Sequence, residues 1–260
     1  MRLTGKRVFI TGAGSGIGQA AAQKCAAEGA RVICGDLNEA SAAASVEAIR
    51  SAGGEAVAVI GDLTDEAACA AMFAKGAEAF GGLDALFNNA GICRGDDAGP
   101  VETSLASWNA TIAANLTSVF LCCKAGIPYL LESGKGVIIN NASIVAMVGS
   151  AFPQIAYTAA KGGVLAMTRE IAIMYARRKL RAVAICPGPT ATPLVKAFLA
   201  DEEAWKLRRR YLPMGRLADP AEIANLVAFL ASDEASFITG SAYTIDGGLT
   251  AAYVIDDSVT

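Results

Sequence analysis

Short apolar runs alternate along the chain with longer, more mixed segments. Apolar runs bounded by glycine or polar residues are typical of strands, and the longer segments are typical of helices. Val137–Ile139 and Ala182–Cys186 are apolar without interruption, as expected for strands buried on both faces of a parallel sheet. The pattern predicts strands at 7–11, 31–35, 55–60, 83–88, 136–141, 180–186 and 241–245, and helices at 16–29, 38–52, 64–80, 102–131, 155–178 and 219–232.

Strands and helices therefore alternate through the chain, with no linker, repeat or low-complexity stretch. Such alternation predicts an α/β fold, a single doubly wound Rossmann-type domain over residues 1–260 with a seven-stranded parallel sheet flanked by helices. Asp219, Pro220 and Glu222 form a strong start signal for the last helix. Ligands of such folds bind beyond the carboxyl ends of the strands, so functional residues are expected there.

Tyr157 and Lys161 lie four residues apart in a predicted helix, fourteen residues after Ser143. This spacing places a phenol and an ammonium on one helix face. A phenol has a pKa near ~10 in water, and a neighbouring cation favours the phenolate and lowers that pKa. A phenol tuned in this way can act as general acid and base in alcohol–carbonyl interconversion. An isolated pair would be interpreted as surface residues, but other motifs accompany this one.

Glycines cluster where the first strand meets the first helix, at Gly12, Gly16 and Gly18. They allow the backbone to approach a pyrophosphate, which then lies on the N–H groups of the helix N-terminus. The spacing differs from the generic Gly-x-Gly-x-x-Gly fingerprint, and a steric role alone would also explain such a turn. No Gly-Lys-Ser or Gly-Lys-Thr follows, which disfavours a phosphate loop for nucleotide hydrolysis. With an acidic residue downstream, the turn predicts dinucleotide binding.

The chain of 260 residues contains no histidine. Ser-His-Asp or Cys-His machinery and imidazole-dependent zinc sites are therefore excluded, and no metal site is predicted. The net charge of −3 argues against nucleic acid as the main partner. No apolar segment approaches the ~18 residues of a membrane span, and no secretory apolar region is present at the start. The seven cysteines include no Cys-x-x-Cys pair and indicate reduced thiols of a cytoplasmic protein.

Further motifs follow in a characteristic order: Asn88-Asn-Ala-Gly91, Ser143, Tyr157-x-x-x-Lys161, Pro187-Gly188, and Ile238-Thr-Gly240 with Asp246-Gly-Gly248. Together with Thr11–Gly18, they make the chain resemble the short-chain dehydrogenase/reductase superfamily from Lys6 to about Gly248. The motifs are specific for the family but not for the substrate. The resemblance implies an enzyme that uses a nicotinamide cofactor to oxidise or reduce CH–OH groups.

The resemblance implies four catalytic residues. Tyr157 would exchange the proton, Ser143 would position the substrate oxygen, and Lys161 would bind the nicotinamide ribose and lower the pKa of the tyrosine. Asn115 lies in a helical stretch where its intrinsic preference is poor, and the family assigns it a water that links the lysine to solvent. A solvated helix-face Asn is the ordinary alternative. Ala160 replaces a serine that is common before the lysine, and no reacting atom is lost.

The resemblance also assigns contacts with the cofactor. Asp62 would meet the adenine amino group, supported by the backbone of Leu63, and Thr192 would contact the carboxamide. Asn88 would instead hold the central sheet. Thr190 stands where many members have an aliphatic residue. The full set implied to bind the cofactor is Gly12, Ser15, Gly16, Ile17, Gly18, Asp36, Leu37, Asp62, Leu63, Asn89, Ala90, Gly91, Tyr157, Lys161, Pro187, Gly188, Thr190 and Thr192.

Asp36 ends the second predicted strand, eighteen residues after Gly18. A carboxylate there can accept hydrogen bonds from an adenosine ribose and repels a 2′-phosphate. Family members that prefer NADP often carry a basic residue in the glycine turn or just after this strand, where this chain has Ser15 and Leu37. NAD is therefore the predicted cofactor. The structural alternative for Asp36 is an N-cap of the helix that begins near Asn38, and the two roles are compatible with each other.

The predicted reaction is reversible hydride transfer between NAD and a secondary alcohol such as a cyclic alcohol, diol or polyol. Reduction of 3-oxoacyl thioesters is an alternative, weakened by Asp36 because that role usually uses NADPH. A catalytically idle dinucleotide-binding sensor is another, and the intact catalytic set argues against it. A methyltransferase would leave Tyr157 and Lys161 unexplained.

By resemblance, the small-molecule substrate meets a mainly apolar pocket and a lid over residues 190–215. The pocket would include Cys93, Arg94, Val145, Met147, Phe152, Gln154, Leu194, Phe198 and Trp205. Lys206, Arg208, Arg209 and Arg210 are interpreted as a solvated face, with an anion contact during lid closure as the sharper alternative. Ala-rich and apolar faces on helices 102–131 and 155–178 exceed what one sheet face needs. Relatives pair these helices into a four-helix bundle, so the resemblance implies a homotetramer. Close packing of the helices on the sheet is the alternative explanation of the alanine content.

Overall fold

The computed structural model describes residues 1–193, 195, 205–206 and 209–251. Its centre is a seven-stranded sheet with the order β3-β2-β1-β4-β5-β6-β7, and every neighbouring pair is parallel. The strands are β1 (Arg7–Thr11), β2 (Arg31–Asp36), β3 (Glu55–Ile60), β4 (Ala85–Asn88), β5 (Val137–Asn141), β6 (Arg181–Pro187) and β7 (Ala242–Ile245). The predicted fold class is confirmed.

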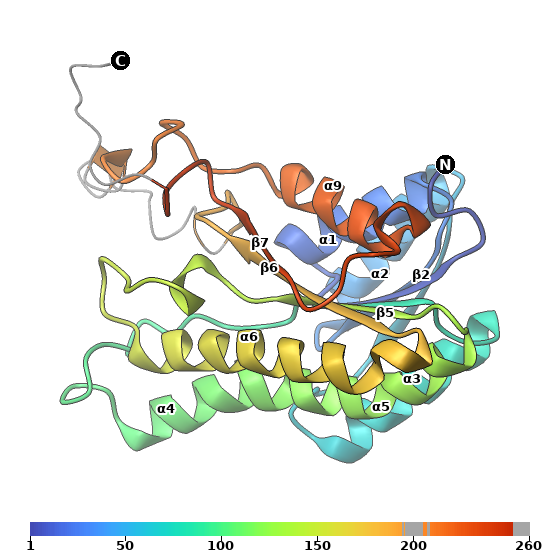
Figure 1. The fold of residues 1–260 in the computed structure, drawn as a ribbon, viewed down its shortest axis with the longest axis horizontal. Coiled ribbons are helices and arrows are strands. Elements are labelled where there is room, and N and C mark those ends of the chain that lie inside the picture. The colour runs from blue at the N-terminus through green and yellow to red at the C-terminus, as the bar shows by residue number, and fades with distance from the viewer. Residues whose placement is uncertain (194, 196–204, 207–208, 252–260) are drawn as a thin grey trace.

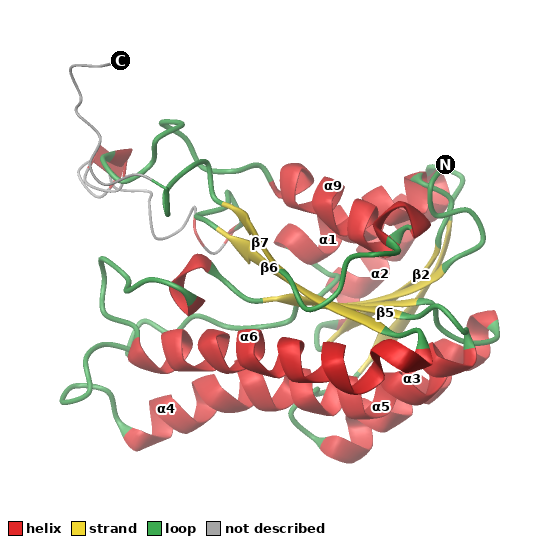
Figure 2. Cartoon of the chain, viewed as in Figure 1, coloured by secondary structure: helices red, strands yellow, loops and turns green. Residues whose placement is uncertain are grey.

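Helices cover both faces of the sheet (Figures 1 and 2). One layer contains α1 (Gly16–Ala27), α2 (Glu39–Ser51) and α9 (Pro220–Ala231). The other contains α3 (Glu66–Phe80), α4 (Leu105–Ile112), α5 (Ser118–Glu132) and α6 (Ile155–Tyr175). Short helical turns lie at Ile144–Ala146, Ala176–Arg178 and Asp233–Ala235. The doubly wound arrangement brings the carboxyl ends of the central strands together at one edge.

Alternate residues of the central strands pack in two separate hydrophobic cores, one on each face of the sheet. Val8 and Ile10 of β1 pack in the core that also contains residues of α1 and α9. Phe9 points to the opposite core and stacks on Phe73 of α3 with ring centroids 4.2 Å apart. Side chains alternate across a strand, so a run that is apolar without interruption fills both cores at once. This explains why the buried strands lack a polar face.

The predicted helix at 102–131 begins later and is not continuous. Ser104 accepts a hydrogen bond from the backbone N–H of Ser107, so α4 starts at Leu105. A π-helical segment, Ala113–Thr117, then separates α4 from α5. Such segments insert an extra residue in a helix and are frequent at functional sites. Here the segment contains Asn115, which is completely buried.

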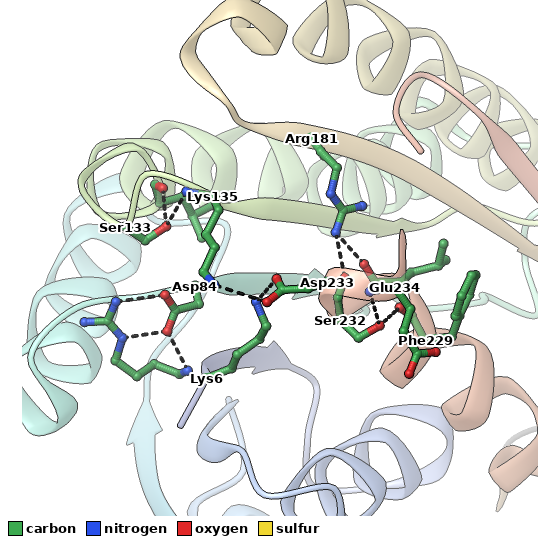
Figure 3. Close-up of polar contacts among 12 residues, drawn as sticks. Lys6, Asp84, Ser133, Lys135, Arg181, Phe229, Ser232, Asp233 and Glu234 are labelled. Atoms are coloured by element: carbon green, nitrogen blue, oxygen red, sulfur yellow. Dashed lines mark hydrogen bonds and ion pairs between the residues drawn. The ribbon is translucent and has the colours of Figure 1, made fainter. Parts of the chain in front are cut away.

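Charged groups connect the amino ends of the strands (Figure 3). The Arg7 guanidinium donates to both oxygens of Asp84, at 2.7 and 2.9 Å. Asp233, after α9, lies between Lys6 and Lys135, with Nζ–O distances of 2.7 and 3.1 Å. Arg181 donates to the carbonyl oxygen of Leu230 at the end of α9. Polar contacts at this edge thus connect the sheet to the helix layer, away from the carboxyl ends.

One helical stretch of the described residues, Leu105–Glu132, is long and apolar enough to cross a membrane by length and composition. The sequence analysis expected no segment of this length and apolar character, and by this measure that expectation is wrong. Half of its apolar window is buried within the protein, and its α5 part packs in the core that α3 and α6 share. These contacts are those of a core helix in a globular domain.

Candidate active site

The glycine turn leaves the N-terminus of α1 open. Gly12 and Gly16 have φ angles of 64° and 53°, in the left-handed region that favours glycine. A Cβ on Gly18 would lie 2.0 Å from the carbonyl oxygen of Gly12, so only glycine fits there. Ser15 is the N-cap, and its side chain makes no capping hydrogen bond. The turn therefore fits the pyrophosphate of a dinucleotide, which would take the first N–H groups of the helix.

Asp36 contacts this turn from the end of β2. One carboxylate oxygen accepts the N–H of Gly14 at 2.8 Å, and the other accepts the N–H of Asn38 at 2.9 Å. The cap of α2 is Asn38, whose side chain accepts from Ser41 N. The alternative role of Asp36 as the helix cap is therefore wrong. Leu37 projects outward with 70% exposure, leaving Asp36 as the charged group at this end of the turn.

Asp62 and Leu63 follow β3 at the predicted adenine end. Asp62 accepts the backbone N–H and the hydroxyl of Thr64 at 2.8 and 2.7 Å. These two hydrogen bonds, the backbone one first, hold the pKa of Asp62 below its usual range. Leu63 is buried, so of the two only the exposed Asp62 presents its side chain at the surface.

Asn89 connects the glycine turn to the strands beside it. Its side-chain nitrogen donates to the carbonyl oxygens of Thr11 and Gly12, at 3.0 and 3.3 Å. Its oxygen accepts from Asn141 of β5 at 3.0 Å. Behind it, Asn88 donates to Asn140 at 2.8 Å within the buried sheet. Asn88 thus connects β4 to β5, in the position that the family resemblance implies.

The loop after β6 approaches the glycine turn from the other side. A Cβ on Gly188 would lie 2.8 Å from the Cα of Asp246, so Pro187–Gly188 pass directly against the chain after β7. Thr190 is buried and donates its hydroxyl to Gly188 O at 3.0 Å. A Cβ on Gly16 would lie 3.0 Å from the methyl carbon of Thr192. Gly16 and Thr192 therefore border the same space.

Lys161 is a buried ammonium beside Tyr157. Its exposed fraction is 3%, and its Nζ donates to the carbonyl oxygen of Asn141 at 2.7 Å. The same nitrogen lies 5.5 Å from the centroid of the Tyr157 ring. Burial lowers the pKa of Lys161 to about 8, although the electrostatic interaction with Cys186 on β6 acts in the opposite direction. Among the residues that the structure describes, the lysine is therefore oriented by the Asn141 carbonyl of the sheet and not by a carboxylate.

Asn115 faces the lysine across Gly91. Its side chain donates to the carbonyl oxygens of Ile92 and Thr111, at 3.0 and 2.9 Å, and accepts from Ile92 N at 3.1 Å. A Cβ on Gly91 would lie 2.5 Å from Asn115 Oδ1 and 3.7 Å from Lys161 Nζ. The π-helical segment thus turns Asn115 inward and positions it near the lysine, with glycine as the only residue that fits between them. A solvated helix-face Asn is excluded.

The pKa of Tyr157 is raised, contrary to the sequence prediction. Burial of the phenol is the main cause, and the neighbouring Cys93 adds to it, while a hydrogen bond with the Ser143 side chain acts in the opposite direction. The expected lowering by Lys161 fails because the ammonium binds the Asn141 carbonyl and lies over the ring. Within the protein alone, Tyr157 is a protonated phenol at neutral pH, close enough to Ser143 for that side chain to affect its pKa.

The predicted pocket residues that the structure describes differ in their contacts and in their exposure. Cys93 and Gln154 approach each other, with 4.0 Å between sulfur and oxygen, whereas Arg94 is held by Asp96 and Ser107. Met147 and Phe152 are each 43% exposed, and Val145 is buried. Leu194, Phe198 and Arg208 lie outside the described residues, as does most of the predicted lid. The anion contact of Lys206, Arg209 and Arg210 stays a prediction.

Two contributors to the site escaped the sequence analysis. Asn141 supplies the carbonyl oxygen that binds Lys161, and Asp97 accepts the N–H groups of Ala156 and Tyr157 at 3.0 and 2.8 Å. A backbone acceptor carries no sequence signal. Asp97 lies in a polar loop sixty residues before Tyr157, so no local spacing indicates the contact.

Comparisons with known proteins decide the family. A family model described as enoyl-(acyl carrier protein) reductase matches residues 12–250. The 2,5-dichloro-2,5-cyclohexadiene-1,4-diol dehydrogenase of Sphingobium indicum is 44% identical, over 95% of this chain and 97% of the relative. The chain belongs to the short-chain dehydrogenase/reductase superfamily. The resemblance inferred from the motifs is thus confirmed.

Other members of the superfamily extend the comparison. The cis-4-hydroxycyclohexanecarboxylate dehydrogenase of Sinomonas cyclohexanicum is 43% identical, over 93% of this chain and 95% of the relative. The crystal structure of levodione reductase superposes with a TM-score of 0.91 at 35% identity, covering 96% of this chain and 99% of that one. These similarities establish oxidoreduction between alcohols and ketones with a nicotinamide cofactor as the reaction class of this short-chain dehydrogenase/reductase.

Proposed function

We propose that the protein is an NAD-dependent dehydrogenase that interconverts a secondary alcohol, such as a ring alcohol, diol or polyol, with its ketone. The observation that carries this proposal is the convergence of Ser143, Tyr157 and Lys161 at the carboxyl ends of β5 and β6. Lys161 is buried beside the tyrosine ring, and the open glycine turn lies at the same edge of the sheet.

The nicotinamide supplies or accepts the hydride when it is bound. For ketone reduction, the Tyr157 hydroxyl donates its proton to the substrate oxygen, and the Ser143 hydroxyl donates a hydrogen bond to the same atom. For alcohol oxidation, Tyr157 must act as the phenolate, which takes the proton from the substrate hydroxyl. The raised pKa of Tyr157 keeps the phenol protonated, which suits it to act as the acid in reduction. Asn115 and Lys161 lie close to each other across Gly91. In this proposal, the two residues return to Tyr157 the proton that it gives to the substrate.

Two features support a ring alcohol as the substrate class. The 44% and 43% identical relatives are named for a cyclohexadiene diol and for a hydroxycyclohexane carboxylate. In this chain, Cys93 lies close enough to Tyr157 to affect its pKa and approaches Gln154, so a thiol and an amide border the tyrosine. A 3-oxoacyl-thioester reductase is the second candidate because the matching family model carries an acyl-carrier-protein reductase description. Asp36 disfavours it if that reaction requires a 2′-phosphate.

NAD is favoured over NADP by the position of Asp36. Its carboxylate is fixed on the N–H of Gly14, and a 2′-phosphate beside it would experience like-charge repulsion. We assign the cofactor contacts to the residues that line this path, from the glycine turn through Asp62, Leu63, Ala90 and Gly91 to Pro187, Thr190 and Thr192. Ser15, Ile17 and Leu37 contribute around the glycine turn.

We further assign the protein to the cytoplasm, as a single domain with a substrate lid over 190–215 that assembles as a homotetramer. Support for assembly comes from exposed apolar and small residues on two long helices. Phe120 of α5 is 51% exposed, and Ile173 and Met174 of α6 are 76% and 61% exposed. Ala159 and Ala166 also lie on the exposed side of α6, where small side chains permit close helix contact.

A substrate screen tests the proposed reaction. The purified protein is mixed with NAD and a panel of cyclic alcohols, diols, polyols and 3-hydroxyacyl thioesters, and NADH is followed by absorbance. We expect turnover on at least one ring alcohol or diol. Tyr157→Phe should lower kcat by at least about a hundredfold. The affinity for NADH should stay close to that of the parent, because only the hydroxyl is lost.

The outcomes separate the candidate functions. Turnover on thioesters alone would replace the proposed function by the acyl-thioester alternative. Binding of NADH without turnover on any substrate would favour a dinucleotide sensor. A Tyr157→Phe variant with activity within tenfold of the parent would show that another group exchanges the proton.

A further inference from the structure

The helix that carries the catalytic tyrosine is capped by a residue from a distant loop. The local N-cap of α6, Gln154, makes no side-chain hydrogen bond to the helix. Instead, Asp97 accepts the N–H of Ala156 at 3.0 Å with one oxygen and the N–H of Tyr157 at 2.8 Å with the other. The carbonyl of Ala98 accepts the N–H of Ile155 at 3.1 Å. Three successive N–H groups of the first turn are therefore held by two residues.

The loop that supplies this cap is itself fixed. Arg94 donates two hydrogen bonds to the Asp96 carboxylate, at 2.8 and 2.9 Å, and Ser107 of α4 donates to the same carboxylate at 3.0 Å. Thr103 accepts the N–H of Ala98 at 2.9 Å. The loop before α4 lies beside the N-terminal end of α6 (Figure 1). The loop that contains Asp97 is thus held in place by its own hydrogen bonds and by one from α4.

Asp97 is almost completely buried, with 6% exposure. Burying a carboxylate is costly unless hydrogen bonds compensate, and here the compensation comes from the helix N-terminus, where negative charge is favourable. Each oxygen has its own N–H partner, and one of these belongs to the backbone of Tyr157. An asparagine at this position could not preserve both hydrogen bonds. Its side-chain NH₂ group would face one of the two backbone N–H groups, and two donors cannot form a hydrogen bond.

Lys161 is anchored differently. Its Nζ binds the Asn141 carbonyl of β5, one turn further along α6 and independently of the loop. A disturbance of the first turn would therefore displace the Tyr157 phenol relative to Ser143 while leaving the lysine on the sheet. Misplacement of a reacting group by about 1 Å can cost on the order of a hundredfold in rate.

We infer that Asp97 is a positioning residue for Tyr157, acting through the first backbone N–H groups of α6 to fix the phenol against Ser143. This inference rests on the proposed function, since it assigns Tyr157 the proton transfer. Asp97 does not touch the reacting atoms, and its effect should appear in the chemical step and not in cofactor binding.

The test compares Asp97→Asn and Asp97→Ala with Asp65→Ala. Asp65 caps α3 by accepting the N–H of Ala68 at 2.7 Å, so its loss removes a similar cap from a helix without a catalytic residue. Hydrogen exchange of peptides covering 152–160 reports the first turn of α6. NADH fluorescence titration gives the dissociation constant, and steady-state kinetics with protonated and deuterated alcohol give kcat, KM and the primary isotope effect.

For Asp97→Asn we expect faster exchange at Ala156 and Tyr157, a kcat lower by about ten- to a hundredfold, and a larger isotope effect. NADH affinity should stay within about threefold of the parent. The reason is that Lys161 is held by the Asn141 carbonyl and does not depend on the cap. Asp65→Ala should lose a few degrees of melting temperature and keep kcat within about twofold. If Asp97→Ala does not fold, Asp97→Asn carries the test.

The inference is overturned by unchanged exchange at 155–157 in Asp97→Asn, or by a kcat within twofold of the parent. It is also overturned if kcat and NADH affinity fall together, which would indicate general damage to the fold. A parent protein without turnover on any alcohol would contradict the proposed function instead. The exchange data would still decide whether Asp97 holds the first turn, as the inference requires.

Discussion

Two titratable groups, the half-buried Tyr157 and the buried Lys161, dominate the chemistry of the site at the scale of single residues. Burial raises the pKa of Tyr157 and lowers that of Lys161 to about 8. Both shifts favour the neutral forms, because burial disfavours the charged form of each group. The spacing of four residues correctly predicted that the two side chains would meet, but not which atoms would face each other. That depends on the carbonyl of Asn141, which only the fold supplies.

The lowered pKa of Lys161 predicts a pH-dependent contribution to stability. A lysine with a folded pKa of about 8 and an ordinary value of 10.5 loses its proton earlier in the folded state, so stability rises with pH between these values. Relative to Lys161→Met, the free energy of unfolding of the parent should increase by about 1–2 kcal/mol between pH ~7.5 and ~9.5. Urea unfolding at both pH values measures this difference. Parallel pH profiles for the two proteins would contradict the assigned shift.

Cofactor preference is the second prediction at this scale. NAD should exceed NADP by at least about a hundredfold in kcat/KM, which corresponds to ~2.7 kcal/mol of repulsion near Asp36. Asp36→Ala combined with Leu37→Arg should narrow or reverse the ratio, because repulsion is removed and a phosphate partner is added. Initial rates with both cofactors provide the measurement.

Leu37→Arg alone is the matched control for the double change. It adds the cation but leaves the carboxylate on Gly14, so most of the preference for NAD should remain. Equal use of both cofactors by the parent would withdraw the NAD assignment, while the proton-transfer roles of Tyr157 and Ser143 would be unaffected.

At the scale of elements, local patterns predicted the order of strands and helices but not their interruptions. Continuous apolar runs gave β5 and β6 to within one residue at each end. The stretch at 102–131 contains the π-helical segment at Ala113–Thr117, in which Asn115 makes hydrogen bonds with the backbone of Ile92. The cap of α6 by Asp97 likewise spans sixty residues. Contacts between distant segments leave no periodic trace in the sequence.

The Arg7–Asp84 pair is predicted to stabilise the amino ends of β1 and β4. Burial alone would raise the pKa of Asp84, but hydrogen bonds from the Arg7 side chain and backbone outweigh it and hold the pKa below its usual range. Asp84→Asn should cost about 2–4 kcal/mol at pH ~7, since it leaves a partly buried guanidinium without its charge partner. Urea unfolding gives the loss, with activity at low denaturant retained.

The pH dependence of this loss has a defined sign. A carboxylate with a lowered folded pKa contributes stability above its unfolded value near ~3.9, and the contribution disappears as pH falls through the folded value. The difference between parent and Asp84→Asn should therefore shrink on acidification. Lys124→Ala is the control, because the Lys124–Glu66 pair is largely exposed and should contribute less than ~1 kcal/mol. Equal losses in the two variants would contradict the role of burial.

At the scale of the whole molecule, chemistry and anchoring occupy opposite edges of the sheet. Tyr157, Lys161 and the glycine turn gather beyond the carboxyl ends of the strands, whereas the ion pairs of Figure 3 connect the amino ends. A variant at the anchoring edge should therefore change stability before it changes turnover. The helices α4, α5 and α6 remain as a layer with exposed apolar residues on its outer side.

This outer layer is predicted to form the contact between subunits. Phe120 on α5 is 51% exposed. A hollow of about 270 Å³ between α3 and α5 is lined by residues that include Leu121 and Tyr129. We expect light scattering at micromolar concentration to give the mass of four chains. Phe120→Glu should shift the protein to a smaller species, because four glutamates would be buried in a symmetric contact.

Ala44→Glu is the matched control, since it adds the same charge at an exposed position of α2 in the opposite helix layer. Its assembly should equal that of the parent. The first turn of α6, with Tyr157, belongs to the same helix as the proposed contact, so dissociation should also lower turnover through loss of support for α6. A parent that is monomeric at micromolar concentration would contradict the homotetramer, and equal dissociation of both variants would place the contact elsewhere.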